Sequence, residues 1–307
     1  MAEPIPFKVG KASPANTFLA IWMAEAAGFY AAQGLALEIV EMVGGSQCGP
    51  ALTAGDIHLM HIGMSSVVRA NAGGADLRTI GSLSNVIRSA LFTAPGVNQA
   101  SDLKGAVVGI SSIGSESDPT TTLALAKIGL ARADVLVREI GVERLAALRD
   151  GTVAATMLGE PQRSAALALG LHAMVDLLAD RIPWLYSGLV VDRAYLSGHG
   201  EVLARFMRAT IEGNYLAVGD PARAKGVLAR ELDLTDAKII DITFENFKAA
   251  TPVNAEISLA GAENIIATVA APDAGHDAFD YIDLGVRDGL RAEGFFDAME
   301  KKYGAPA

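Results

Sequence analysis

Short apolar runs alternate with amphipathic segments between residues 5 and 192, and polar, glycine-rich stretches separate them. Apolar runs of about four to eight residues between turns are typical of strands, whereas apolar residues at every third or fourth position are typical of helices. The pattern therefore predicts an α/β fold. The expected strands are 5–11, 37–43, 57–62, 77–84, 87–93, 106–111, 135–139, 154–158 and 185–192, and the expected helices are 18–30, 48–53, 67–72, 120–130, 143–149 and 162–170.

One part of this pattern occurs twice. Residues 51–63, ALTAGDIHLMHIG, align without a gap with residues 147–159, ALRDGTVAATMLG, and the copies share an opening Ala-Leu, two glycines and a β-branched residue. The segment 9–13 also resembles 108–112. The copies lie 96 residues apart (147 − 51), which is far longer than the repeat of a solenoid. We therefore predict two α/β lobes of similar topology with a cleft between them.

After residue 199 the apolar positions recur only with helical spacing. Helices are expected at 202–218, 222–231, 235–249 and 257–268, with start signals such as Asp220-Pro221. Because no strand pattern accompanies these helices, we expect them to form a helical C-terminal cover on the first lobe rather than a third domain.

Composition limits the class of function. A chain of 307 residues has room for two domains, and 51% hydrophobic with 20% charged residues is typical of a globular protein. The formal charge of −10 provides no basic surface for nucleic acid or for an anionic membrane. The single cysteine, Cys48, excludes an intramolecular disulfide and a cysteine metal cluster.

The compartment stays open at this stage. No apolar stretch is long enough to span a bilayer, and residues 1–4 run directly into a predicted strand without the charged and apolar regions of a leader peptide. The protein is therefore either cytoplasmic or an exported protein whose leader has been removed.

Polar loops follow the expected parallel strands in both copies. They comprise residues 13–17, 44–47 and 63–66 in the first copy and 112–118, 141–142 and 159–161 in the second. Ligands of open α/β sheets bind outside the carboxyl ends of the strands, and helix starts offer free N–H donors there. We therefore expect a small polar solute between the lobes. The candidate ligand contacts are Ser13, Asn16, Thr17, Gly45, Ser46, Gln47, Met64, Ser65, Asn85, Ser112, Gly114, Ser115, Glu116, Asp118, Glu160, Trp184 and Tyr186.

Two groups among these candidates have alternative roles. Glu116, Asp118 and Glu160 either cap helices or face the cleft, and in the cleft they would favour a ligand with N–H or cationic character over a bare anion. Trp184 and Tyr186 either form an aromatic platform for the ligand or pack in the core.

The sequence contains none of the following catalytic or metal-binding motifs. The glycine-rich segment 109–116 lacks the lysine of a phosphate-binding loop, and neither a Gly-x-Ser-x-Gly nor a His-Glu-x-x-His motif occurs. His58 and His61 lie three positions apart on a predicted strand, so their side chains point to opposite faces. No histidine is positioned beside Cys48 by the sequence. We predict no catalytic residue, no metal and no cofactor.

Residues 24–35, AEAAGFYAAQGL, resemble the A-x-x-x-G-F/Y-F/Y-x-x-x-G-L signature of substrate-binding proteins of ABC importers. The branch in question contains the binders of aliphatic sulfonates, taurine, nitrate and thiamine-pyrimidine precursors. Segments 44–46, 51–57, 101–105 and 147–151 match its other recurring stretches in order. The resemblance covers about residues 7–176.

This resemblance implies a two-lobed type II periplasmic binding fold that closes on its solute at a hinge. Lobe 1 would comprise residues 1–90 and 190–307, lobe 2 would comprise 91–189, and the crossings would lie near 87–93 and 187–191. It also implies a periplasmic location, with a leader peptide ahead of the present sequence, a membrane permease as partner and a monomeric state. By position, the family's ligand-facing loops would correspond to those of Asn16, Ser46, Ser65, Ser115 and Glu160.

The expected function is the solute-binding component of an ABC importer. Family habit and the helix N-termini favour a sulfonate-like anion, whereas Glu116 and Glu160 favour a pyrimidine- or amine-like ligand. One alternative is an enzyme on the same scaffold, a decarboxylase or desulfinase of aromatic acids. Related desulfinases need a cysteine in the first loop and related pyrimidine synthases carry a cysteine-rich motif, and this chain has neither. Another alternative is a cytoplasmic ligand sensor.

Overall fold

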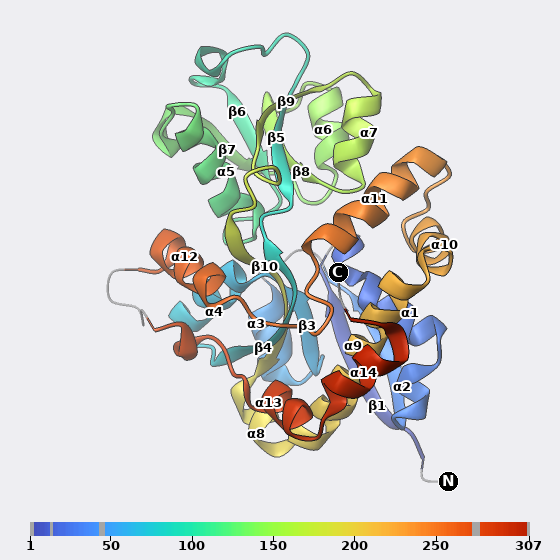
Figure 1. Ribbon diagram of the computed structural model, residues 1–307. Coiled ribbons are helices and arrows are strands. Elements are labelled where there is room, and N and C mark those ends of the chain that lie inside the picture. Colours follow the sequence, from blue (N-terminus) through green and yellow to red (C-terminus); the bar gives the residue numbers. More distant parts are fainter. Residues whose placement is uncertain (1–2, 13–14, 43–46, 272–276, 306–307) are drawn as a thin grey trace.

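The computed structural model describes residues 3–12, 15–42, 47–271 and 277–305. They form two five-stranded sheets, one above the other in Figure 1, each flanked by helices. The predicted α/β class with two lobes is confirmed.

The first sheet consists of β1 (Ile5–Lys11), β2 (Leu35–Glu41), β3 (Leu59–Ile62), β4 (Leu77–Val86) and β10 (Pro183–Asp192). The strand order is β2-β1-β3-β10-β4. β1 is parallel to β2 and β3, whereas β10 is antiparallel to β3 and β4. All four residues of β3 are buried, as expected for a central strand that is covered on both faces.

The second sheet consists of β5 (Ser89–Thr93), β6 (Val107–Ile110), β7 (Leu136–Glu139), β8 (Ala155–Gly159) and β9 (His172–Asp176). Its order, β7-β6-β8-β5-β9, has the same form, with β6 parallel to β7 and β8 and with β5 antiparallel to β8 and β9. The internal repeat of the sequence thus corresponds to three parallel strands in each sheet.

The chain passes between the sheets twice. It leaves the first sheet after Val86 and enters the second at Ser89, which lies within the predicted crossing at 87–93. It returns between Asp176 and Pro183, ahead of the crossing predicted at 187–191. Residues 187–192 pair with β4 instead, because the apolar run of β10 fits between two strands of the first sheet. The lobe boundaries at 90/91 and 189/190 stay predictions, and sheet membership favours moving the second boundary to 176–183.

Helices cover both sheets. Those of the first 200 residues are α1 (Leu19–Ala26), α2 (Phe29–Ala32), α3 (Cys48–Ala54), α4 (Met64–Ala72), α5 (Ser117–Lys127), α6 (Arg144–Arg149), α7 (Gln162–Ala168) and α8 (Arg193–Gly198). The predicted helix 18–30 is divided because Gly28 has a left-handed backbone, with φ of 75°. No helix in the described part of the chain is both long and apolar enough to cross a membrane.

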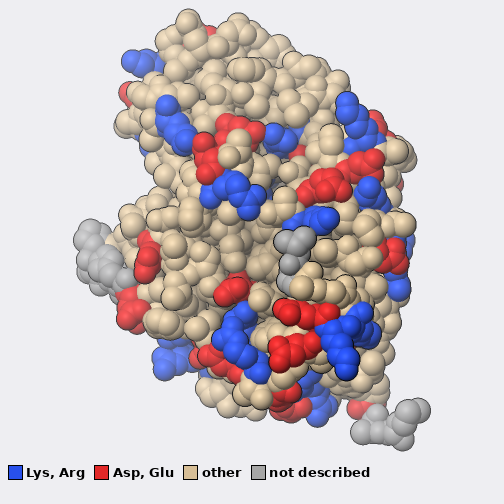
Figure 2. All heavy atoms as spheres, viewed as in Figure 1, with Lys and Arg blue, Asp and Glu red and all other residues tan. Residues whose placement is uncertain are grey.

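The C-terminal helices pack mainly on the first sheet's half, as the sequence predicts. They are α9 (Gly200–Gly219), α10 (Pro221–Glu231), α11 (Ala237–Ala250), α12 (Leu259–Val269), α13 (Gly285–Ala292) and α14 (Phe295–Tyr303). α9 packs on α1, α13 and α14 pack on α9, and α12 packs on β10 and α4. α11 also contacts α7 beside the second sheet and so extends across the gap between the lobes (Figure 1). Lys, Arg, Asp and Glu side chains are interspersed on the face that Figure 2 shows.

Candidate functional site

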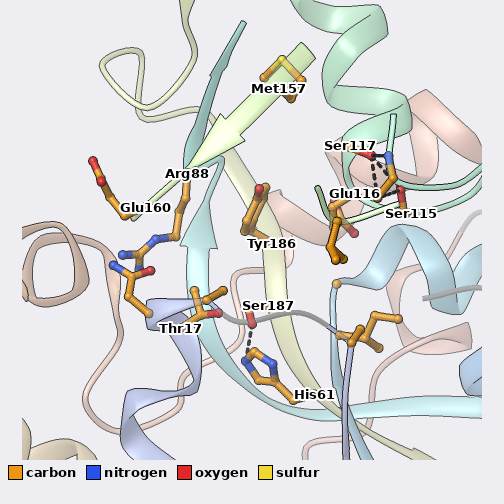
Figure 3. A pocket seen from close by; sticks show the side chains of 18 of the residues that line it. Thr17, His61, Arg88, Ser115, Glu116, Ser117, Met157, Glu160, Tyr186 and Ser187 are labelled. Atoms are coloured by element: carbon orange, nitrogen blue, oxygen red, sulfur yellow. Dashed lines mark hydrogen bonds between the residues drawn. The ribbon is translucent and has the colours of Figure 1, made fainter. Parts of the chain in front are cut away.

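A cavity of about 140 Å³ lies between the two sheets. Its walls come from the loops after β1, β3, β6, β7 and β8, which are the strand ends that the repeat identifies, together with β10 and the first crossing. The lining residues are Ala12, Ala15, Asn16, Thr17, His61, Ile62, Gly63, Ser66, Arg88, Ser111, Ser115, Glu116, Ser117, Val142, Arg144, Met157, Gly159, Glu160, Gln162, Tyr186 and Ser187. Figure 3 shows Glu160 and Glu116 on opposite sides of this cavity, with Tyr186 between them.

Six of the predicted ligand contacts line the cavity: Asn16, Thr17, Ser115, Glu116, Glu160 and Tyr186. Ser13, Gly45 and Ser46 lie outside the described residues. The others do not line the cavity; they are Gln47, Met64, Ser65, Asn85, Ser112, Gly114, Asp118 and Trp184. Which of the six touch a ligand stays a prediction.

The two aromatic candidates separate. Trp184 is 1% exposed and packs in the core, and its indole Nε1 donates to Glu116 Oε2 over 2.7 Å. Tyr186 lines the cavity. Of the two alternatives for this pair, core packing therefore applies to Trp184 and the cavity wall to Tyr186.

Asp118 is held by basic side chains instead of facing the cavity. Its carboxylate pairs with Arg132 at 2.6 Å and with Arg69 at 3.3 Å, and it accepts the Gly114 backbone N–H at 3.0 Å. Asn85 is also occupied elsewhere, because its amide donates to the Glu256 carbonyl at 2.8 Å.

Glu116 and Glu160 line the cavity, but protein donors already bind both carboxylates. Glu116 accepts the Ser65 backbone N–H at 2.9 Å in addition to the Trp184 indole. Glu160 accepts the Ser164 backbone N–H at 3.2 Å, Arg163 Nη1 at 3.3 Å and Asn246 Nδ2 at 3.0 Å. The oxygens that would accept a ligand's N–H groups are therefore largely occupied by protein donors, and Arg163 also compensates the charge of Glu160.

Two arginines that the sequence reasoning missed supply positive charge. Arg88, on the first crossing, is 4% exposed, and burial lowers its pKa to about 10, so that it remains a cation at neutral pH. Its Nη1 lies 3.4 Å from Thr251 Oγ1, and its buried Nη2 has no hydrogen-bond partner among the described residues. Arg144 donates Nε to the Met157 carbonyl at 2.9 Å, and burial lowers its pKa also. The one signal for Arg88 was a lone charge within the otherwise uncharged stretch 86–93.

Neutral polar groups complete the wall. His61 Nε2 and Ser187 Oγ lie 2.5 Å apart, and burial lowers the pKa of His61 to about 4, so the imidazole is neutral at pH 7 (Figure 3). The hydroxyls of Ser111, Ser115 and Ser117 form a ring of hydrogen bonds of 2.7–2.9 Å. Among the described residues, no group of three or more His, Cys, Asp and Glu side chains is arranged to hold a metal ion.

Two sheets of matching topology that enclose a polar cavity define the two-lobed fold of the periplasmic solute-binding proteins. Solved structures with this fold include periplasmic sulfonate- and nitrate-binding proteins. The chain belongs to the NMT1/THI5-like family, whose model matches residues 15–224. The family relationship expected from the residues 24–35 and the later motifs is thereby confirmed.

Individual relatives agree with this assignment. The riboflavin-binding protein RibY of Chloroflexus aurantiacus is 27% identical over 218 residues, which are 69% of this chain and 62% of that protein. The chain therefore spans less than two thirds of that relative's length. A protein from Bordetella bronchiseptica RB50 has the same fold with a TM-score of 0.80 at 18% identity, covering 99% of both chains. The alkanesulfonate-binding protein SsuA from Xanthomonas axonopodis pv. citri, bound to MOPS, has a TM-score of 0.72 at 21% identity, covering 87% of this chain and 92% of that chain. The relatives that carry functional names here are binding proteins rather than enzymes.

Proposed function

We propose that this protein is the solute-binding component of an ABC importer and that its solute is a small molecule with an anionic group. The observation that carries the proposal is the buried guanidinium of Arg88, a residue that lines the cavity and whose Nη2 has no hydrogen-bond partner among the described residues. A buried donor without an acceptor costs about 1–3 kcal/mol, and a charged hydrogen bond to a ligand oxygen would offset that cost.

The hydrogen bonds around the cavity support one of the two ligand classes left open by the sequence. Glu116 and Glu160 are bound by protein donors, so they no longer favour an amine or a pyrimidine N–H. Arg88 and Arg144 bring two cations to the lining of the cavity. This balance supports a carboxylate or a sulfonate, whose oxygens accept from guanidinium groups with good geometry.

Cavity size supports a ligand of modest dimensions. The volume of about 140 Å³ is close to the ~150 Å³ of an engineered cavity that holds benzene, and it is below the ~300 Å³ at which drug-sized pockets begin. In this closed arrangement the protein would hold a single-ring or short-chain anion. The much larger molecule named for the riboflavin-binding relative would require a wider separation of the lobes.

Delivery would depend on lobe movement rather than on bond chemistry. The solute would enter between separated lobes, the lobes would close over it at the two crossings, and a membrane permease would recognise the closed form. This role implies a periplasmic location, and we expect a monomer.

The test is a ligand panel built around pairs of similar size that differ in charge. Ethanesulfonate is compared with ethanesulfonamide and benzoate with benzamide, beside nitrate, pyrimidines and primary amines, by thermal shift and then by calorimetry. A ligand present at about 100 times its dissociation constant should stabilise the protein by roughly 2.7 kcal/mol. We expect shifts only from the anions.

Two outcomes would contradict the proposal. A shift from an amine or a neutral amide that exceeds that of its anionic counterpart would refute the anionic ligand. A ligand that is consumed during incubation, rather than recovered intact, would favour the enzyme alternative over the importer role.

A further inference from the structure

Two residues that line the cavity each have a buried side-chain atom without a hydrogen-bond partner among the described residues, and the two atoms are of opposite kinds. Arg88 Nη2 is a donor, and the anionic group of the proposed solute would bind it. Gln162 Oε1 is an acceptor, and an anionic group cannot bind it. A buried acceptor that stays unpaired costs free energy just as an unpaired donor does. A solute that satisfies both atoms therefore carries a donor in addition to its anionic group.

The orientation of the Gln162 amide follows from one carbonyl group. Its Nε2 donates to the Val142 carbonyl oxygen at 3.1 Å, and Val142 also lines the cavity. A carbonyl oxygen only accepts hydrogen bonds, so the amide nitrogen faces Val142 and the amide oxygen is left for another donor. Exchanging the two amide atoms would place oxygen against oxygen. The unpaired atom of Gln162 is thus an acceptor.

Gln162 and Arg88 belong to neighbouring strand ends of the second sheet's half. β5 pairs with β8 so that Ser89 lies opposite Gly159, and Arg88 directly precedes Ser89. Gln162 is the first residue of α7, which follows β8 in the chain. Figure 3 shows Arg88 on the same side of the cavity as Glu160, which ends two positions before Gln162. In a cavity of about 140 Å³, one small molecule can therefore reach both Arg88 and Gln162.

The internal repeat gives Gln162 a counterpart in the first lobe whose side chain is already used. The offset of 96 places Ser66 at the equivalent position (162 − 96), and Ser66 also lines the cavity. Its Oγ donates to the Gly114 carbonyl oxygen at 3.0 Å. The first copy therefore uses this position for a contact between the lobes, whereas the second copy presents an unpaired acceptor.

The acceptor of Gln162 is uncharged, which favours a neutral donor over an ammonium group. The nearest carboxylate along the chain, Glu160, already pairs with Arg163 at 3.3 Å. Arg88 and Arg144 bring two positive charges to the lining of the cavity. An ammonium group would lose its water here without gaining a carboxylate partner at Gln162, whereas a hydroxyl group or an amide N–H needs only one neutral acceptor.

We propose that Gln162 is a specificity-determining residue that selects anions carrying a neutral hydrogen-bond donor, either a hydroxyl group or an amide N–H. This inference rests on the proposed function, because it names the class of anion that the same cavity binds. The carboxylate or sulfonate binds Arg88, and the neutral donor binds Gln162 Oε1. Anions with an alkyl group in place of the donor bind more weakly, because they leave this oxygen buried and unpaired.

The test compares three sulfonates of nearly equal size by calorimetry. Isethionate carries a hydroxyl group, 1-propanesulfonate a methyl group and taurine an ammonium group at the same position. We expect isethionate to bind on the order of three- to tenfold more tightly than 1-propanesulfonate, and also more tightly than taurine. Two carboxylates, succinamate and 4-oxopentanoate, differ by an amide NH₂ against a methyl group. A preference for succinamate identifies the amide as the donor, and a preference for isethionate identifies the hydroxyl group.

Two variants make the preference specific to Gln162. Gln162→Met removes the acceptor and nearly keeps the length of the side chain, so the donor-bearing anion and its methyl counterpart should then bind equally well. Ser66→Ala, at the equivalent position of the first copy, should keep the preference of the parent protein. Because each result is a ratio of two affinities measured on one variant, a general loss of stability or of lobe closure does not change it.

The outcomes separate this inference from the proposed function. A preference for a donor-bearing anion that is present in the parent protein and lost in Gln162→Met supports the inference. Equal affinities within both pairs in the parent protein, or a preference that survives in Gln162→Met, would overturn it while leaving the anionic ligand in place. Binding of none of the sulfonates and carboxylates would refute the anionic ligand itself, and this class of anion with it.

Discussion

The two sheets have the same strand order but different cores. In the first, the ring of Phe206 stacks on Phe7 at 4.9 Å and on Tyr30 at 5.3 Å, with α9 supplying Phe206 from the C-terminal cover. In the second, Phe92 packs with alanine, valine and leucine side chains such as Leu148 and Leu158. Topology is therefore shared between the halves, whereas the means of stabilising it is not.

The C-terminal helices account for this difference. The cover of α9, α13 and α14 buries the first half's aromatic core. Exposed large apolar side chains occur in both halves, for example Leu136 and Leu169 in the second and Phe279 in the first, so the halves differ in the cover and not in the exposure of apolar side chains. The core of the first half therefore depends on residues more than 100 positions further along the chain, whereas the core of the second half comes from the continuous stretch 90–173.

The largest expected effect is on the aromatic core. Phe206→Ala should lower the free energy of unfolding by about 3–5 kcal/mol, because it creates a cavity and removes two ring contacts. Phe92→Ala deletes an equally buried ring that has no ring partner among the described residues, and should cost about 1 kcal/mol less. Urea unfolding of both variants measures the difference. Equal decreases in the free energy of unfolding would show that the ring contacts stabilise the protein no more than their buried apolar area does.

The second effect depends on pH. In the alignment of the two repeat copies, Met157 is the residue equivalent to His61. The variant His61→Met therefore gives the first sheet the residue that the second sheet has at this position. Burial lowers the pKa of His61 to about 4, so the neutral form stabilises the folded protein above pH 6.5 and this contribution is lost as the pH falls towards 4. It amounts to about 3 kcal/mol over that range. Urea unfolding between pH 7 and pH 4 should show a shallower acid decline in His61→Met, and an unchanged decline would assign acid sensitivity elsewhere.

The sequence predicts the features of this fold that depend on neighbouring residues, and it does not predict those that depend on contacts between distant parts of the chain. The repeat located the loops after β1, β3, β6 and β8, because glycines and alternating apolar residues act locally. The sheet to which β10 belongs could not be predicted from the sequence, because a buried apolar run is compatible with strands of either sheet. Arg88 gained its burial and its partner Thr251 from a segment 163 residues away, and Glu116 found its donors 51 and 68 residues away. No local pattern records such contacts.

Two cavity arginines should contribute unequally to ligand affinity: Arg88 on the first crossing and Arg144 at the start of α6 in the second lobe. Arg88→Met should weaken binding of the anion found in the panel by about 1.5–3 kcal/mol, which is roughly 10- to 150-fold. Arg144→Met should have a smaller effect, because Arg144 is less buried and already donates to Met157. Calorimetry gives both affinities, and chemical unfolding serves as the control, since removing a buried donor without a partner should leave Arg88→Met at least as stable as the parent. Equal losses from both variants would contradict the ranking.

The smallest expected effect lies at the sheet edges. β7 forms one edge of the second sheet and exposes Leu136 beside the charged Arg138 and Glu139, whereas the charged residues Glu38 and Glu41 on β2, an edge of the first sheet, have no exposed leucine beside them. Charged side chains on an edge strand discourage pairing with another molecule, and an exposed leucine does not. Leu136→Lys should therefore change the free energy of unfolding by less than about 0.5 kcal/mol while reducing any weak self-association. Sedimentation at high protein concentration measures the association, and a large loss of stability would show that Leu136 contributes to the core of the second lobe after all.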